Sequence, residues 1–126
     1  MPALPPVVGD PIYELWRLRY ADGQPMVFVI TYLPRVLFPD FEQEDFKDSS
    51  LYYLLETRYD KKVDWMSRTL EATLAGDYEA GLLGIHKGDP IQFFESVGYL
   101  KDNTPIEYSH ARYRGKGSRF HFKLSR

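Results

Sequence analysis

The stretch that decides the fold runs from Tyr13 to Pro34 and reads YELWRLRYADGQPMVFVITYLP. Two runs rich in aromatic and branched residues flank the pair Asp22-Gly23. This pair favours a tight turn, because glycine tolerates a positive φ and aspartate can hydrogen-bond its own backbone. The stretch therefore predicts a β-hairpin, with strands over about residues 13–20 and 25–33.

The first strand of this hairpin has an unusual polar face. Side chains alternate along a strand, so Trp16 and Leu18 point one way while Arg17 and Arg19 point the other. Two arginine forks on one face suit a phosphate or a carboxylate. The alternative is that they pair with carboxylates of a neighbouring strand on an exposed face. The second strand is apolar on both faces, which predicts an interior strand that ends at Pro34.

The rest of the chain alternates short strands and helices. Residues 1–11 are rich in proline and predict an extended leader. The pattern further predicts a loop with a possible short helix over 35–49, a helix from Ser49-Ser50 to about Arg58, and a strand over 63–74. A second helix is expected over 77–83, with Asp77 as its N-cap and Gly84 at its exit. Three strands follow, over about 91–100, 105–113 and 119–124.

The helix near residue 50 has a start that suits an anion. Neither Ser49 nor Ser50 has Glu or Gln three positions later, so no capping box closes this end. The first-turn amides are then available to an anion. The alternative is an ordinary serine cap.

The sequence predicts a second hairpin that resembles the first and lies 80 residues further along the chain. Asp102-Asn103 aligns with Asp22-Gly23, and asparagine, like glycine, tolerates positive φ. In the strand that follows, one face carries Glu107, Ser109, Ala111 and Tyr113. A glutamate and a tyrosine on one strand face can line the same cavity.

Composition narrows the class of protein. A chain of 126 residues is one domain with a sizeable core, and its ten Tyr and eight Phe suit β-rich cores and ligand-binding walls. The absence of Cys excludes disulfides, thiolate metal sites and a cysteine nucleophile, and fits a cytoplasmic protein. A net charge of −2 makes the chain by itself a poor DNA binder. No apolar run is long enough to span a bilayer, and no signal peptide opens the chain.

Catalytic and metal motifs do not emerge from the sequence. The three histidines stand far apart, and neither a nucleophile elbow nor a glycine-rich phosphate loop is present. We therefore expect no metal, no cofactor and no enzymatic activity. What remains is a binding constellation, in which the arginines and the helix start hold an anion while a glutamate and two tyrosines hold the rest of a small molecule. Its members are Arg17, Arg19, Ser49, Ser50, Tyr52, Glu107 and Tyr113.

An ordered set of short segments resembles the UTRA domain, the effector-binding domain of the HutC-type branch of GntR-family transcription regulators. The segments are RLR at 17–19, ADGQP at 21–25, TYLP at 31–34 with LFP at 37–39, SLY at 50–52, TPIEY at 104–108 and YRG at 113–115. The resemblance covers about residues 12–124. It implies an α+β fold of the chorismate-lyase type, in which helices pack on an antiparallel sheet. It also implies a dimer, and a winged helix-turn-helix domain that precedes the chain in relatives and contacts DNA.

The resemblance assigns roles to the binding constellation. In relatives that bind amino-sugar phosphates, the counterparts of Arg17, Arg19, Ser50 and Tyr52 surround the phosphate, and those of Glu107 and Tyr113 lie at the sugar. Those relatives carry a glutamate where this chain has Val29, which argues for a different small anionic metabolite. The alternatives are a small lyase acting on a carboxylate substrate on the same fold, and a pure dimerisation module.

Overall fold

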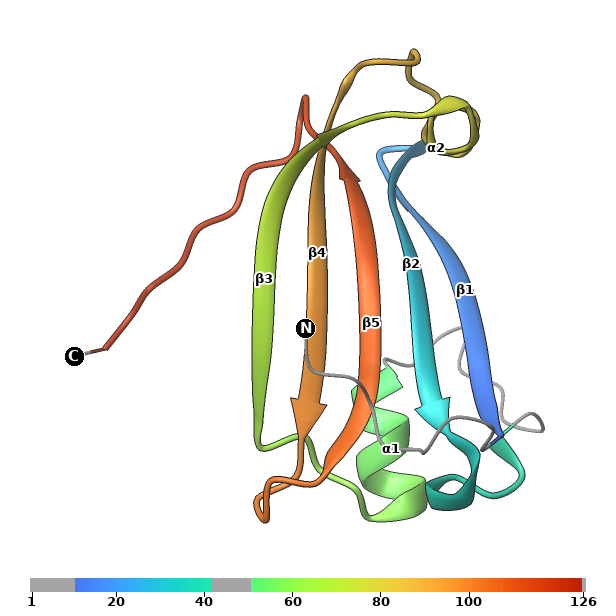
Figure 1. Ribbon diagram of the computed structural model, residues 1–126, viewed down its shortest axis with the longest axis vertical. Helices are drawn as coiled ribbons and strands as arrows, with labels where there is room; N and C mark the ends of the chain where they lie inside the picture. Colours follow the sequence, from blue (N-terminus) through green and yellow to red (C-terminus); the bar gives the residue numbers. More distant parts are fainter. Residues whose placement is uncertain (1–10, 42–50, 126) are drawn as a thin grey trace.

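The computed structural model describes residues 11–41 and 51–125. These residues form one antiparallel sheet of five strands with two α-helices and a short 3-10 helix (Figure 1). Across the sheet the strands lie in the order β1-β2-β5-β4-β3. Their bounds are Ile12–Ala21 for β1, Gln24–Pro34 for β2, Trp65–Leu74 for β3, Pro90–Tyr99 for β4 and Pro105–Arg114 for β5, and those of the helices are Arg35–Leu37 for η1, Leu51–Tyr59 for α1 and Asp77–Leu83 for α2.

The β1–β2 hairpin forms as its sequence predicts. Asp22 and Gly23 have φ values of 52° and 76°, and positive φ at both central residues is the backbone of a type I′ turn. β2 lies between β1 and β5, and its buried residues fall on both of its faces, as with Val27 and Phe28. The prediction of an interior strand is therefore confirmed, and it ends at Pro34 as expected.

The second hairpin, β4–β5, is also present, but its turn is longer than the first. Residues 100–104 connect the strands, and Asn103 takes a φ of 70°. The Asn103 N–H donates to the Leu100 carbonyl at 2.9 Å. The two hairpins meet through β2 and β5, which pair antiparallel in the middle of the sheet. The similarity between the two turn sequences thus corresponds to two hairpins that lie side by side in the sheet.

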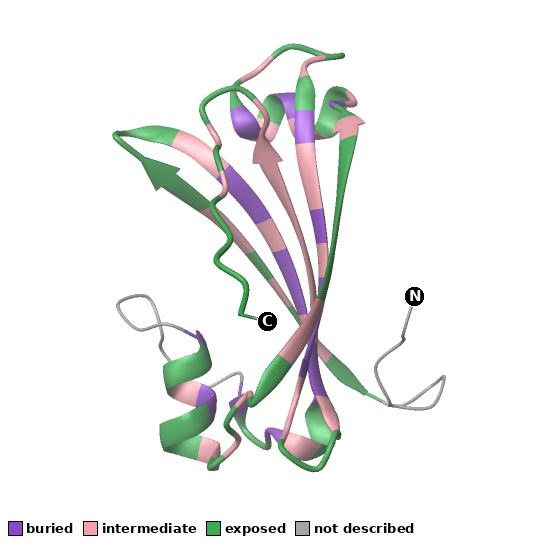
Figure 2. Ribbon diagram, turned by 90° about the vertical axis from the view of Figure 1, so that its left-hand side faces the viewer, coloured by how far each residue is buried: buried purple, intermediate pink, exposed green. Residues whose placement is uncertain are grey.

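The two helices pack at opposite ends of the strands (Figure 1) and on opposite faces of the sheet. On one face, Leu83 of α2 packs against Phe28 and Ile30 of β2. On the other face, Leu55 of α1 packs against Leu33 of β2. In Figure 2 the buried segments of the twisted sheet lie mainly in its interior strands. The part of the α1 face that this helix does not cover is left for a cavity.

Two sequence predictions are wrong. Residues 119–124 form no strand, since Gly117 (φ 89°) turns the chain away and Phe120 instead packs against the rings of Phe94 and Tyr113, with centroids 4.8 Å from each. The N-cap of α2 is Gly76 rather than Asp77. The Gly76 N–H donates to the Glu79 carboxylate at 3.2 Å, so the cap comes from within the first turn.

The segment after β2 was expected to hold a loop and a possible short helix over 35–49. Its start forms the 3-10 helix η1, and residues 42–50 lie outside the described residues. Within the described ranges, none of the helices is long and apolar enough to cross a bilayer.

Candidate functional site

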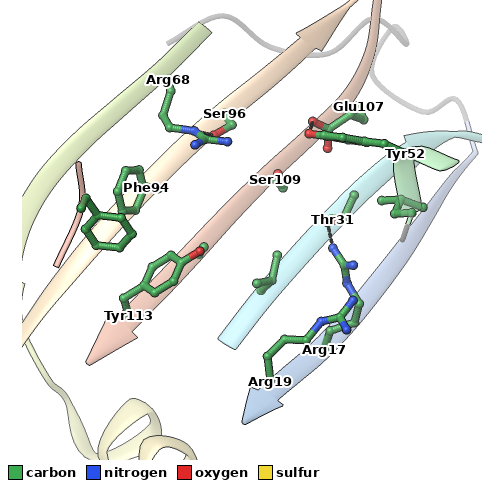
Figure 3. A pocket seen from close by; sticks show the side chains of 14 residues that line it. Arg17, Arg19, Thr31, Tyr52, Arg68, Phe94, Ser96, Glu107, Ser109 and Tyr113 are labelled. Atoms are coloured by element: carbon green, nitrogen blue, oxygen red, sulfur yellow. Dashed lines mark hydrogen bonds between the residues drawn. The ribbon is translucent and has the colours of Figure 1, made fainter. Parts of the chain in front are cut away.

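A cavity of about 280 Å³ opens on the α1 face of the sheet. The strand register places its lining in two rows across the sheet, because residues paired in register share a face. Arg17, Val29, Ala111 and Phe94 form one row, and Thr31, Ser109, Ser96 and Arg68 form the other. All eight line the cavity, together with Arg19, Leu51, Tyr52, Glu107, Tyr113 and Phe120 (Figure 3).

Arg17 and Arg19 form the β1 side of the cavity. The residues across from them on β2 are Val29 and Val27, so the alternative of cross-strand pairing with carboxylates does not apply. Arg17 donates one N–H to the Thr31 hydroxyl at 3.2 Å. Its Nε is buried and finds no acceptor among the described residues. Burial, followed by the like charge of Arg19, lowers the pKa of Arg17. An anion at this side relieves both effects.

Glu107, which is buried, and Tyr52, which is partly exposed to solvent, form a hydrogen-bonded pair where α1 meets the sheet. Glu107 is 1% exposed, and the Tyr52 hydroxyl donates to its carboxylate at 2.8 Å. Burial raises the pKa of Glu107, although hydrogen bonds from Tyr52 and Ser109 oppose this shift. Burial, followed by the charge of Glu107, also raises the pKa of Tyr52. The pair therefore offers the cavity a hydrogen-bond acceptor in a dry environment.

The space for this carboxylate depends on Gly98. Gly98 lies across from Glu107 in the β4–β5 register. A Cβ on Gly98 would come within 3.1 Å of both Cγ and Oε1 of Glu107. Because Gly98 has no side chain, it leaves the space on the neighbouring strand that the buried Glu107 carboxylate occupies.

The far side of the cavity is formed by residues that the sequence analysis did not single out. Arg68 of β3 donates its Nε to the Ser96 hydroxyl at 2.9 Å, and its guanidinium lies 5.6 Å from the centre of the Phe94 ring. Phe120, from the segment after β5, packs against Phe94 and closes this side. Arg68 gives a weak signal in the sequence, as one basic residue on an edge strand. Its position becomes evident only once the order of the strands is known.

Five of the seven predicted site residues line this one cavity: Arg17, Arg19, Tyr52, Glu107 and Tyr113. Ser49 and Ser50 lie outside the described residues. Val29, noted from the sequence as a departure, lies in the middle of the cavity floor beside Ala111. No group of three or more metal-ligating side chains occurs within residues 11–41 and 51–125.

The fold and the cavity define a small ligand-binding domain of the α+β class, with a basic, hydroxyl-lined site on one sheet face. The chain belongs to the UTRA domain family, whose profile matches residues 3–119. It is 33% identical over 104 residues to the HTH-type transcriptional regulator GmuR of Bacillus subtilis, covering 82% of this chain and 44% of the relative. It is 30% identical to the HTH-type transcriptional repressor NagR of the same organism, covering 82% and 42%. The chain thus spans less than half the length of these two curated relatives.

Solved structures share this fold. The effector domain of PhnF from Mycobacterium smegmatis superimposes with a TM-score of 0.88 at 27% identity, covering 95% of this chain and 74% of that one. The ligand-binding domain of a GntR-family regulator from Bordetella bronchiseptica gives a TM-score of 0.86 at 22% identity, covering 93% and 75%. The expected fold, an antiparallel sheet with packed helices of the chorismate-lyase type, is confirmed.

Proposed function

We propose that this chain is the ligand-sensing domain of a HutC-type GntR transcription regulator and that it binds a small anionic metabolite, such as a phosphosugar, in the cavity of the α1 face. Arg17 and Arg19 hold the anion. Tyr52, Glu107 and Tyr113 hold the remainder of the molecule, with Glu107 accepting from its hydroxyl groups. The chain has no catalytic role and works in the cytoplasm.

One observation carries this proposal. Among residues 11–41 and 51–125, the buried Nε of Arg17 has no acceptor, and Arg17 sits beside a second arginine with valines across the strand. A buried donor without a partner costs free energy, about 1–3 kcal/mol. A phosphate or carboxylate supplies the missing acceptor and neutralises the repulsion between the two guanidinium groups. The folded protein therefore favours an anion at this position.

Regulation follows from the position of the site between α1 and the sheet. The ligand contacts Tyr52 on α1 and the arginines on β1, so it favours one placement of the helix relative to the strands. In the whole regulator, a homodimer with a DNA-binding domain ahead of this one, that change alters the spacing of the two DNA-binding domains. The designation of the two relatives above as HTH-type regulators supports the DNA-binding part of this proposal.

The test is calorimetric titration with a panel of phosphosugars and small carboxylic acids, in the parent and in Arg17→Met. We expect at least one phosphosugar to bind, and the substitution to weaken it about tenfold or more, because a charge-assisted hydrogen bond contributes about 1.5–3 kcal/mol. Arg58→Met, on α1 and outside the cavity, is the control for the loss of one charge. If no anion binds, or if both variants bind equally well, the proposal fails.

A lyase on the same fold is the rival function. Among the described residues that line the cavity, the carboxyl group is that of Glu107, which is 1% exposed and therefore poorly placed to act as an accessible general acid or base. Incubation with chorismate, followed by product analysis, separates the two functions. Turnover that Arg17→Met abolishes would establish the lyase. Light scattering on the same preparation tests the proposed homodimer.

A further inference from the structure

We infer that the ligand of this cavity is elongated, with an anionic group at each end and hydroxyl groups between them. This inference rests on the proposed function and deepens it. The feature that carries it is Arg68, a third arginine of the cavity, which enters from the side opposite Arg17 (Figure 3).

The two arginines stand at opposite edges of the sheet. Arg17 lies on β1 and Arg68 on β3, and these are the two outermost strands. Neighbouring strands are about 4.8 Å apart, so the two residues reach into the cavity from opposite sides rather than forming one cluster. Both still act on the same interior, since each lowers the pKa of Glu107 through its charge.

Each arginine is held in the same way. The Arg17 guanidinium donates to Thr31 at 3.2 Å, and the Arg68 guanidinium donates to Ser96 at 2.9 Å. Within residues 11–41 and 51–125, the other contacts of Arg68 are with weak acceptors, namely the Met66 sulfur at 3.0 Å and the Phe94 ring. Within the described part of the chain, neither arginine has a carboxylate within ion-pair distance. Each guanidinium is thus oriented by a hydroxyl group and keeps N–H donors for an anion.

A row of hydroxyl groups joins the two ends. Thr31, Ser109 and Ser96 lie in register across β2, β5 and β4, and the next residue in the row is Arg68 itself. Beside this row runs the apolar floor of Val29 and Ala111. A polyol chain matches these two rows, because its hydroxyl groups meet the serines and threonine while its carbon backbone covers the apolar floor. A second acidic group then meets Arg68.

The test uses two matched pairs of probes that differ only in whether the end opposite the phosphate is a carboxylate or a CH2OH group. The pairs are 6-phosphogluconate with sorbitol 6-phosphate, and 4-phosphoerythronate with erythritol 4-phosphate. Calorimetry is run on the parent, on Arg68→Met, on Arg17→Met and on the control Arg58→Met. We expect the parent to bind the acid of at least one pair about tenfold or more tighter than its alcohol, as for one charge-assisted contact.

The variants separate this inference from the proposed function. We expect Arg68→Met to abolish the preference for the acid while leaving the affinity for the alcohol unchanged, and Arg17→Met to weaken both members. Equal binding of acid and alcohol by the parent, or a preference that survives in Arg68→Met, overturns the inference alone. If the parent binds none of the four phosphates but binds another member of the phosphosugar panel, the inference is overturned and the proposed function stands. If no anion of either set binds, both fail.

Discussion

At the scale of single residues, Glu107 is the most consequential side chain, because it is an acid that the fold buries. Burial raises its pKa above the unfolded-state value of about 4.5. A raised carboxyl pKa means that Glu107 contributes stability below the unfolded pKa, and that this contribution is lost as the pH rises through the folded pKa. The parent therefore loses stability at this site on going from acid to neutral pH.

Glu107→Gln removes the titration and keeps the shape. We expect the free energy of unfolding of this variant, relative to the parent, to rise between about pH 4.5 and pH 8, as the parent alone bears the cost of a buried charge. Urea unfolding at a series of pH values measures the difference. Glu71→Gln, on the exposed edge strand β3, controls for the loss of one negative charge. A difference between Glu107→Gln and parent that stays constant with pH would falsify the explanation.

At the scale of elements, α2 shows how two glycines of one helix serve different purposes. Gly81 lies in the helix interior with helical φ, and a Cβ added there meets nothing within 4 Å. Gly84 ends the helix with a φ of 66°, in the left-handed region that glycine adopts readily.

Adding the same methyl group to these two glycines should give opposite results. We expect Gly81→Ala to stabilise the domain by about 0.5–1 kcal/mol through helix propensity. Gly84→Ala should destabilise it by about 1 kcal/mol, because a Cβ is strained at positive φ. Each variant serves as the control for the other in thermal or urea unfolding. Shifts of the same sign in both would show that the helix end is not the constraint.

The elements also show what the sequence allowed us to predict. Both hairpins and both α-helices follow from local signals, since Asp22-Gly23, Asn103 and Gly84 mark turns and ends by their own backbone preferences. The predicted strand over 119–124 does not form, because alternating side chains do not by themselves provide a neighbouring strand to pair with. Phe120 instead lines the cavity. Likewise, Arg68 joins the site through strand order, which no short stretch of sequence encodes.

At the scale of the whole molecule, the core is divided between the two ends of the sheet. One cluster, around Leu83, lies under α2, and the other, around Leu55, lies under α1; both leucines are 0% exposed. β2 links the two clusters, since Phe28 belongs to the first and Leu33 to the second. The cavity lies on the part of the α1 face that the second cluster does not cover. A ligand there acts on a sheet that both clusters stabilise.

Because one continuous strand carries both clusters, we expect the domain to unfold as a single cooperative unit. Leu55→Ala and Leu83→Ala should each lower the free energy of unfolding by about 2–5 kcal/mol, through lost burial and the cavity left behind. The two tryptophans report on the two ends of the sheet. The ring centroids of Trp16 and Phe28 lie 5.3 Å apart at one end, and those of the stacked pair Trp65 and Tyr99 lie 4.1 Å apart at the other.

Trp16→Phe and Trp65→Phe backgrounds therefore let fluorescence follow each end separately during urea unfolding. We expect both reporters to give the same midpoint in Leu55→Ala and in Leu83→Ala, shifted from the parent, because neither end retains its structure once β2 separates from its neighbours. A Trp16 signal that is lost before the Trp65 signal in Leu83→Ala would mean that the α2 end unfolds independently. In that case a ligand bound near α1 would stabilise only its own end of the sheet.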